Sequence, residues 1–94
     1  MSQTNMNKYI VEFLGTLLLS FVIFASKGNF LAIGSALAIA VLLGGAISGG
    51  AFNPAITIAM FYIHKLPQSD LIPYIIAQIA GGLAGVELSK QFTK

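Results

Sequence analysis

The chain has 94 residues, of which 56% are hydrophobic and only 9% are charged. Soluble domains carry about 25% charged residues, so this composition excludes an ordinary soluble globular protein. The net charge of +2 comes from scattered lysines and no arginine is present, which gives nucleic-acid binding no electrostatic support. The absence of cysteine excludes disulfides and thiolate metal sites, and there is one histidine, His64. We therefore expect neither a metal nor a cofactor.

Three long apolar runs predict membrane-spanning helices, over about residues 9–26, 30–47 and 71–89. A spanning helix needs roughly 17 to 25 predominantly apolar residues, and each run meets this requirement near its lower limit. A cleaved signal peptide is the alternative for the first run, because Lys8 precedes it. Two further apolar segments would still have to lie in lipid, however. The chain is therefore expected to be an integral, multi-pass protein of the plasma or inner membrane.

A glycine-rich, uncharged segment lies between the second and third runs, over about residues 48–62. Four glycines within residues 44–50 favour irregular backbone. The segment carries no charge, so it can still lie in the membrane. Non-helical backbone at that depth is tolerated only where it is buried in protein or lines a water-filled cavity. The segment is therefore predicted to be a re-entrant loop followed by a half-helix.

Asn53 and Pro54 predict where the helix resumes. Asparagine is a favoured N-cap, and proline suits the first helical position because its missing N–H would have no partner there. A helix from Pro54 to about Tyr62 would be on the order of 13 Å long, less than half of a hydrocarbon core of about 30 Å. Its N-terminus, with roughly half a positive charge, favours oxygen lone pairs and repels cations. The expected fold is all-α, with three transmembrane helices plus one re-entrant half-helix, in a single domain over residues 1–94.

Short motifs accompany each of these predicted elements. The segment 48–57 reads Ser-Gly-Gly-Ala-Phe-Asn-Pro-Ala-Ile-Thr. It resembles the first Asn-Pro-Ala loop of the major intrinsic protein family, the aquaporins and glycerol facilitators. The supporting matches in the three long helices are Glu12 with Thr16, Ala32-Ile33-Gly34, and Ala77-Gln78 with Gly81 and Gly85. The resemblance covers about residues 9 to 90 and implies half of the aquaporin fold, which is one of its two inverted repeats.

The resemblance implies a passive channel for water or a small neutral solute such as glycerol. In the family, the asparagine of the Asn-Pro-Ala motif donates its side-chain amide to the oxygen of the permeating molecule. Asn53 takes that role here, and Pro54 and Ala55 position it. Backbone carbonyls before the asparagine line the pore in the family. The matching residues of this chain are Gly50, Ala51 and Phe52.

Polar residues and glycines of the long helices are expected to support the loop and the helix packing. By the resemblance, Glu12 accepts hydrogen bonds from loop N–H groups, and the alternative is that it snorkels to the lipid headgroups. Thr16 lies one turn later and shares the interior face of Glu12. Gln78 is either an interhelical hydrogen-bond partner, as we expect, or a pore-lining residue. Gly81 and Gly85 have the spacing of close helix packing rather than of solute contact.

The remaining polar and aromatic residues are assigned to the membrane surface. Tyr9, Tyr62 and Tyr74 are expected in the interfacial aromatic belt. His64 and Lys65 follow the half-helix and are expected in a solvated loop, with a role in gating as the alternative.

The sequence also departs from the family pattern. A complete member has six spanning helices and two Asn-Pro-Ala loops, whereas this chain contains one repeat. Ile56 occupies the position that matches the arginine of the family's selectivity filter. Ile33 stands where many members have an aromatic filter residue, and Ala51 stands where the first loop often has histidine. These departures weaken the expectation of strict water selectivity.

One repeat cannot close a pore, because its half-helix meets nothing from the opposite side of the membrane. Two copies in opposite orientations would recreate the pseudo-two-fold arrangement, so we expect an inverted homodimer, by analogy assembled into a pseudo-tetramer of pores. The lysines on the two sides of the membrane are too evenly balanced to determine one orientation. They are Lys8 and Lys65 on one side and Lys27, Lys90 and Lys94 on the other.

Two functions from other classes stay open. The chain is alternatively a non-conducting aquaporin fragment that binds a partner, or a small holin-like protein that makes non-selective lesions. An enzyme is not expected, because no nucleophile with a base, metal cluster or phosphate loop is visible.

Overall fold

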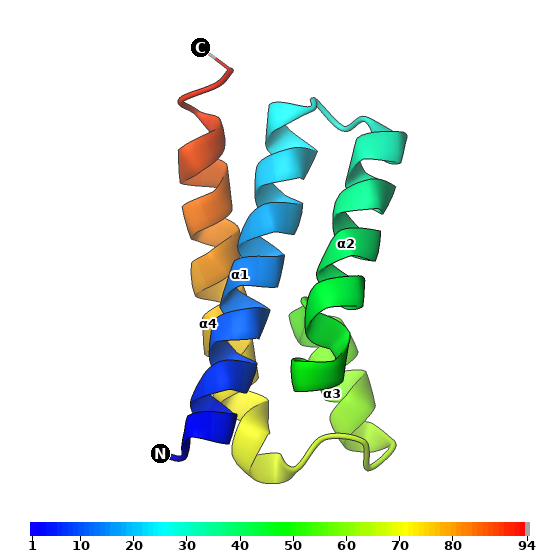
Figure 1. The fold of residues 1–94 in the computed structure, drawn as a ribbon, viewed down its shortest axis with the longest axis vertical. Helices are drawn as coiled ribbons and strands as arrows, with labels where there is room; N and C mark the ends of the chain where they lie inside the picture. The colour runs from blue at the N-terminus through cyan, green and yellow to red at the C-terminus, as the bar shows by residue number, and fades with distance from the viewer. Residues whose placement is uncertain (94) are drawn as a thin grey trace.

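The computed structural model describes residues 1–93, which form four helices and no strand (Figure 1). The helices are α1 (Gln3–Ala25), α2 (Phe30–Ser48), α3 (Pro54–Tyr62) and α4 (Gln68–Ser89). The three long helices run along the 40 Å axis of a molecule that is 23 Å by 20 Å across (Figure 1). The N-terminus and the α3–α4 connection lie at one end, and the α1–α2 connection and the end of α4 lie at the other (Figure 1).

Three of the helices are long and apolar enough to cross a membrane: α1 with 23 residues, α2 with 19 and α4 with 22. A 19-residue helix is about 28 Å long, close to the thickness of a hydrocarbon core. In contrast, α3 has nine residues and lies in the lower half of the molecule in Figure 1. The protein is thus an integral, multi-pass membrane protein, and its all-helical fold of three spans and one half-helix confirms the predicted fold class.

Both α1 and α4 begin before the apolar runs that predict them. The side chain of Ser2 caps α1 by accepting a hydrogen bond from the backbone N–H of Asn5, at 3.1 Å. Gln3 donates to Asn7 one turn further on, at 2.8 Å. These local contacts extend the helix through polar residues that hydropathy alone excludes from a span.

Small residues bring α2 close to α1. Every fourth residue on one face of α2 is small and buried: Ala36, Ala40, Gly44 and Ser48. A side chain at Gly44 would run into Val11 of α1. Along its length α2 packs mainly against α1, and large apolar side chains on its other faces remain exposed, among them Leu37, Leu42 and Leu43.

Glycines of α4 bring it even closer to α1. A side chain at Gly81 would overlap the backbone carbonyl of Phe13, and one at Gly85 would overlap the carbonyl of Leu17. Ser20 of α1 donates a hydrogen bond to the carbonyl oxygen of Gly82, at 2.7 Å. Backbone-to-backbone approach of this kind requires residues without a Cβ. As a result, α1 lies between α2 and α4, and α3 packs on α4.

Candidate functional site

The segment between α2 and α3 consists of five residues of irregular backbone. Gly49 ends α2 in the left-handed conformation, with φ of 90°, and its N–H donates to the carbonyl of Gly45 at 2.8 Å. Gly50 follows with φ of 68° and Phe52 with φ of 52°. Glycine adopts this conformation without steric cost, whereas an aromatic residue at positive φ costs on the order of 1–3 kcal/mol. The surroundings of Phe52 must therefore hold it in place.

The ring of Phe52 is held in a site that Gly15 opens on α1. Phe52 is buried, and a side chain at Gly15 would overlap its ring. The same ring also lies beside Gly44 of α2. Sequence reasoning missed Gly15, although the glycine between Glu12 and Thr16 in an apolar run was a visible signal for a close contact.

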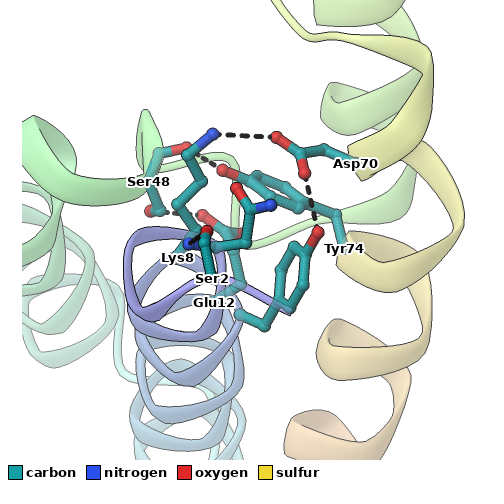
Figure 2. A network of polar contacts seen from close by, with 8 residues as sticks. Ser2, Lys8, Glu12, Ser48, Asp70 and Tyr74 are labelled. Carbon is teal, nitrogen blue, oxygen red and sulfur yellow. Dashed lines mark hydrogen bonds and ion pairs between the residues drawn. The ribbon is translucent and has the colours of Figure 1, made fainter.

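Glu12 is the centre of the polar network that holds the loop, and Figure 2 shows it beside Ser48. Its side chain is 0% exposed, and both carboxylate oxygens accept hydrogen bonds. Oε1 accepts from the backbone N–H of Phe52 and from the side-chain amide of Gln78, both at 2.8 Å. Oε2 accepts from the hydroxyl of Ser48 at 2.6 Å. The carboxylate thus links α1 to the end of α2, to the loop and to α4.

Gln78 extends this network to the half-helix. Its side-chain amide also donates to the hydroxyl oxygen of Thr57, at 2.6 Å, and that hydroxyl donates to the backbone carbonyl of Asn53, at 2.9 Å. Thr57 is fully buried. Gln78 is therefore an interhelical hydrogen-bond partner. Sequence reasoning assigned no role to Ser48 or Thr57, although they are the hydroxyl residues of the loop and the half-helix.

Asn53 caps α3 and remains exposed. Its Oδ1 accepts a hydrogen bond from the N–H of Ala55 at 2.7 Å, so the amide nitrogen points away from that contact. No donor within residues 1–93 bonds to the carbonyl oxygens of Gly50, Ala51 and Phe52. The start of α3 at Pro54 confirms the boundary that the capping pattern predicts.

The other predicted pore residues lie in different places. Ala55 is exposed and Ile56 is 48% exposed on the face of α3 away from Thr57, whereas Pro54 is half-buried. Ile33 is half-buried in the first turn of α2, and the helix rises on the order of 22 Å from there to its end at Ser48. The structure therefore does not bring Ile33 together with Asn53.

Thr16 does not join the Glu12 network. Its hydroxyl is buried and has no hydrogen-bond partner among the described residues. The residue faces Gly82 of α4 instead. One helical turn places it about 6 Å further along α1 than Glu12, beyond the level of the loop. No contact among residues 1–93 supports the expected role of Thr16 in holding the loop.

Tyr74 is buried in the protein, which makes its expected place in the interfacial belt wrong. The side chain is 1% exposed, and its hydroxyl donates to the backbone carbonyl of Ser48 at 2.7 Å. Its ring meets that of Tyr9 edge to face, with centroids 6.0 Å apart. Tyr62, in contrast, is 81% exposed at the end of α3.

An ion pair lies at the same end of the molecule. Asp70 in the first turn of α4 accepts hydrogen bonds from Lys8, at 3.0 Å, and from the hydroxyl of Tyr9, at 2.8 Å. Asp70 is only 2% exposed, so both of its carboxylate oxygens are satisfied inside the protein. Figure 2 shows this cluster next to Tyr74 and Ser48. Sequence reasoning assigned Asp70 no role, because its partners are more than sixty residues away along the chain.

Comparison with known proteins identifies relatives that match most of this chain. A glycerol uptake facilitator protein-like 6 of Lactiplantibacillus plantarum is 43% identical over 95 residues, which cover 93% of this chain and 44% of that protein. Aquaporin Z of Brucella melitensis is 36% identical, over 88% of this chain and 42% of its own length. A propanediol uptake facilitator of Salmonella typhimurium is 45% identical, over 60% of this chain and 21% of its own length. The chain spans less than half the length of these relatives.

The family-level comparison covers the whole chain. The sequence profile of the family described as Major intrinsic protein matches residues 1–94. The match includes all three spans, the loop with its buried carboxylate and the half-helix capped by Asn53. The chain belongs to the major intrinsic protein family.

Proposed function

We propose that the chain forms one half of a passive channel for water or small neutral solutes such as glycerol. The observation that carries this proposal is the irregular segment from Gly49 to Asn53, which buried hydrogen bonds at Ser48 and Phe52 hold between membrane-spanning helices. Polar backbone inside a bilayer is stable only when protein or water covers it. A water-filled path along this segment meets that requirement.

The polar groups of this segment that have no partner within residues 1–93 suit an uncharged solute with hydroxyl groups. The amide nitrogen of Asn53 donates to a solute oxygen, since its Oδ1 is engaged by Ala55. The carbonyls of Gly50, Ala51 and Phe52 accept hydrogen bonds from solute hydroxyls. The N-terminus of α3 places a partial positive charge beside the path, which disfavours cations. The names of the relatives, which are a glycerol uptake facilitator, a propanediol uptake facilitator and an aquaporin, support the same class of solute.

The second half of the channel is proposed to be another copy of the chain in the opposite orientation. A single copy leaves Asn53 exposed and leaves large apolar side chains of α2, such as Leu42 and Leu43, uncovered by residues 1–93. An inverted copy would bring a second half-helix to the membrane midplane and cover this face. The five lysines divide two against three between the two sides of the membrane, which does not favour one orientation and permits insertion in both. By analogy, several such pairs would assemble into a pseudo-tetramer of pores.

Stopped-flow swelling of liposomes that contain the pure protein tests this proposal. A selective channel passes water or glycerol and preserves a proton gradient. A holin-like protein dissipates the gradient, and a non-conducting fragment passes none of these species. Either of the last two results would overturn the proposal.

Asn53→Ser provides the matched test of the site. Serine keeps a capping oxygen for α3 but removes the amide donor, so the helix is retained and the contact with the solute is lost. We expect solute permeability to fall about tenfold or less, the scale of one hydrogen bond. Asn29→Ser is the control, because Asn29 caps α2 in the same way at the other end of the molecule. If the two variants have equal permeability, the Asn53 amide does not contact the permeating solute.

A further inference from the structure

The re-entrant loop has a second attachment besides Glu12, at the end of α2. We propose that Tyr74, held by the cluster of Lys8, Tyr9 and Asp70, positions the loop and so couples its conductance to an ion pair at the membrane surface. The inference rests on the proposed channel function for its effect on conductance. The attachment itself is argued from contacts alone.

The attachment begins at the carbonyl of Ser48. This group ends α2 and has no partner within the helix, as is general for helix C-termini. Tyr74 donates its hydroxyl to that carbonyl at 2.7 Å, while the hydroxyl of Ser48 donates to Glu12. Ser48 therefore joins both attachments. Glu12 also holds the far end of the loop through the N–H of Phe52, whereas Tyr74 holds its beginning.

Tyr74 in turn depends on the residues around its ring. The ring of Tyr9 packs against it edge to face, at an interplanar angle of 82°. Asp70 lies one turn before Tyr74 on α4. Its carboxylate accepts a hydrogen bond from the Tyr9 hydroxyl, which determines where the ring of Tyr9 lies. Lys8 compensates the charge of Asp70, and its side chain is 25% exposed. The cluster thus runs from the membrane surface to the loop.

The cluster is not needed simply to hold α1 and α4 together. These helices already pack backbone to backbone at Gly81 and Gly85, and Ser20 bonds to α4 further along. No other side chain of α4 bonds to the carbonyl of Ser48 within the described chain. The specific contribution of the cluster is therefore the orientation of the Tyr74 hydroxyl toward the loop.

Hydrogen exchange of the loop amides tests the attachment without requiring conduction. We expect Tyr74→Phe to raise the exchange rates of the amides from Gly49 to Phe52 about 2- to 10-fold, the scale of one net hydrogen bond. Tyr62→Phe is the matched control, because it removes the hydroxyl of an exposed tyrosine. Unchanged loop exchange in Tyr74→Phe would overturn the proposal.

A double-mutant cycle tests the link to the surface. Lys8→Met and Asp70→Asn are expected to speed loop exchange when Tyr74 is present and to add nothing in the Tyr74→Phe background. Lys8→Arg keeps the charge and is expected to behave as the original protein. Effects that add fully to that of Tyr74→Phe would show that the ion pair acts only on general stability, and would overturn the coupling.

Permeability per folded channel in liposomes supplies the functional readout. We expect Tyr74→Phe and Lys8→Met to change the ratio of glycerol to water permeability, which a uniform loss of folded protein would not change. If the loop amides exchange faster but the ratio of glycerol to water permeability does not change, the proposed effect on conductance is wrong. If the original protein does not conduct at all, the proposed function fails while the exchange experiment still decides the attachment.

Discussion

Glu12 and Thr16 lie one turn apart on α1, yet their surroundings differ completely. Glu12 faces the loop and receives donors from Phe52, Gln78 and Ser48, so a carboxylate is tolerated inside the membrane span. Thr16 lies beyond the loop and its buried hydroxyl is unpaired within the described chain. A buried polar group stabilises a fold only when its partners are in place. Removal of the polar atoms is therefore expected to destabilise the protein strongly at Glu12 and hardly at all at Thr16.

Glu12→Ala is expected to lower the free energy of unfolding by about 3 kcal/mol or more, because it removes the acceptor of three buried hydrogen bonds. Thr16→Val is the control and is expected to change it by less than about 0.5 kcal/mol, since it replaces an unpaired hydroxyl with a methyl group of similar shape. Reversible unfolding in detergent micelles measures both. A similar loss of stability in the two variants would contradict this difference between Glu12 and Thr16.

At the scale of the elements, the packing of α4 on α1 depends on which glycine faces the partner backbone. Gly81 meets the carbonyl of Phe13, whereas neighbouring Gly82 has only the methyl group of Thr16 nearby, at 3.9 Å from where a Cβ would lie. Adjacent positions on one helix face different directions, so the same substitution has different consequences. A backbone carbonyl cannot move aside as a flexible side chain can.

Gly81→Ala is expected to destabilise the protein by about 1–3 kcal/mol through steric overlap with the backbone of α1. Gly82→Ala is expected to be neutral or to stabilise it by up to about 1 kcal/mol, because alanine favours helix and has room there. Thermal unfolding of the two variants side by side gives the comparison. Greater loss of stability in Gly82→Ala would place the helix interface on the wrong face of α4.

At the scale of the whole molecule, the proposed inverted pair determines which residues of two copies meet. The N-terminus of α3 would lie near the membrane midplane in both copies, so that Ala55 of one copy approaches Ala55 of the other. Lys27 lies in the α1–α2 connection at one end of the molecule (Figure 1). In an inverted pair the two copies of Lys27 would be separated by the full thickness of the membrane.

Single-cysteine cross-linking distinguishes an inverted pair from a parallel one, and the absence of native cysteine removes any background. We expect Ala55→Cys to form a covalent dimer on oxidation in membranes and Lys27→Cys to form none. Cross-linking through position 27, or none through position 55, would contradict the inverted pair. Tags on both chain ends provide a second check, since one fixed orientation in cells would exclude pairing between inverted copies.

The amino-acid sequence by itself determined the local features of this protein. Hydropathy is a property of each segment, so the three spans could be predicted from it, and the capping chemistry of Asn53 and Pro54 predicted where α3 begins. The family resemblance indicated that Glu12 accepts hydrogen bonds from the loop. The motif pattern did not reveal which other side chains meet it.

Only the tertiary structure decided those partners. Glu12 and Gln78 are 66 residues apart, and Tyr74 reaches Ser48 across 26 residues. Such contacts depend on the rotation and register of helices that pack through small residues, and neither quantity is encoded in a local pattern. Tyr74 illustrates the difference, because a tyrosine near the end of an apolar run is typical of the interfacial belt, yet the packing of α4 on α1 buries it against the loop.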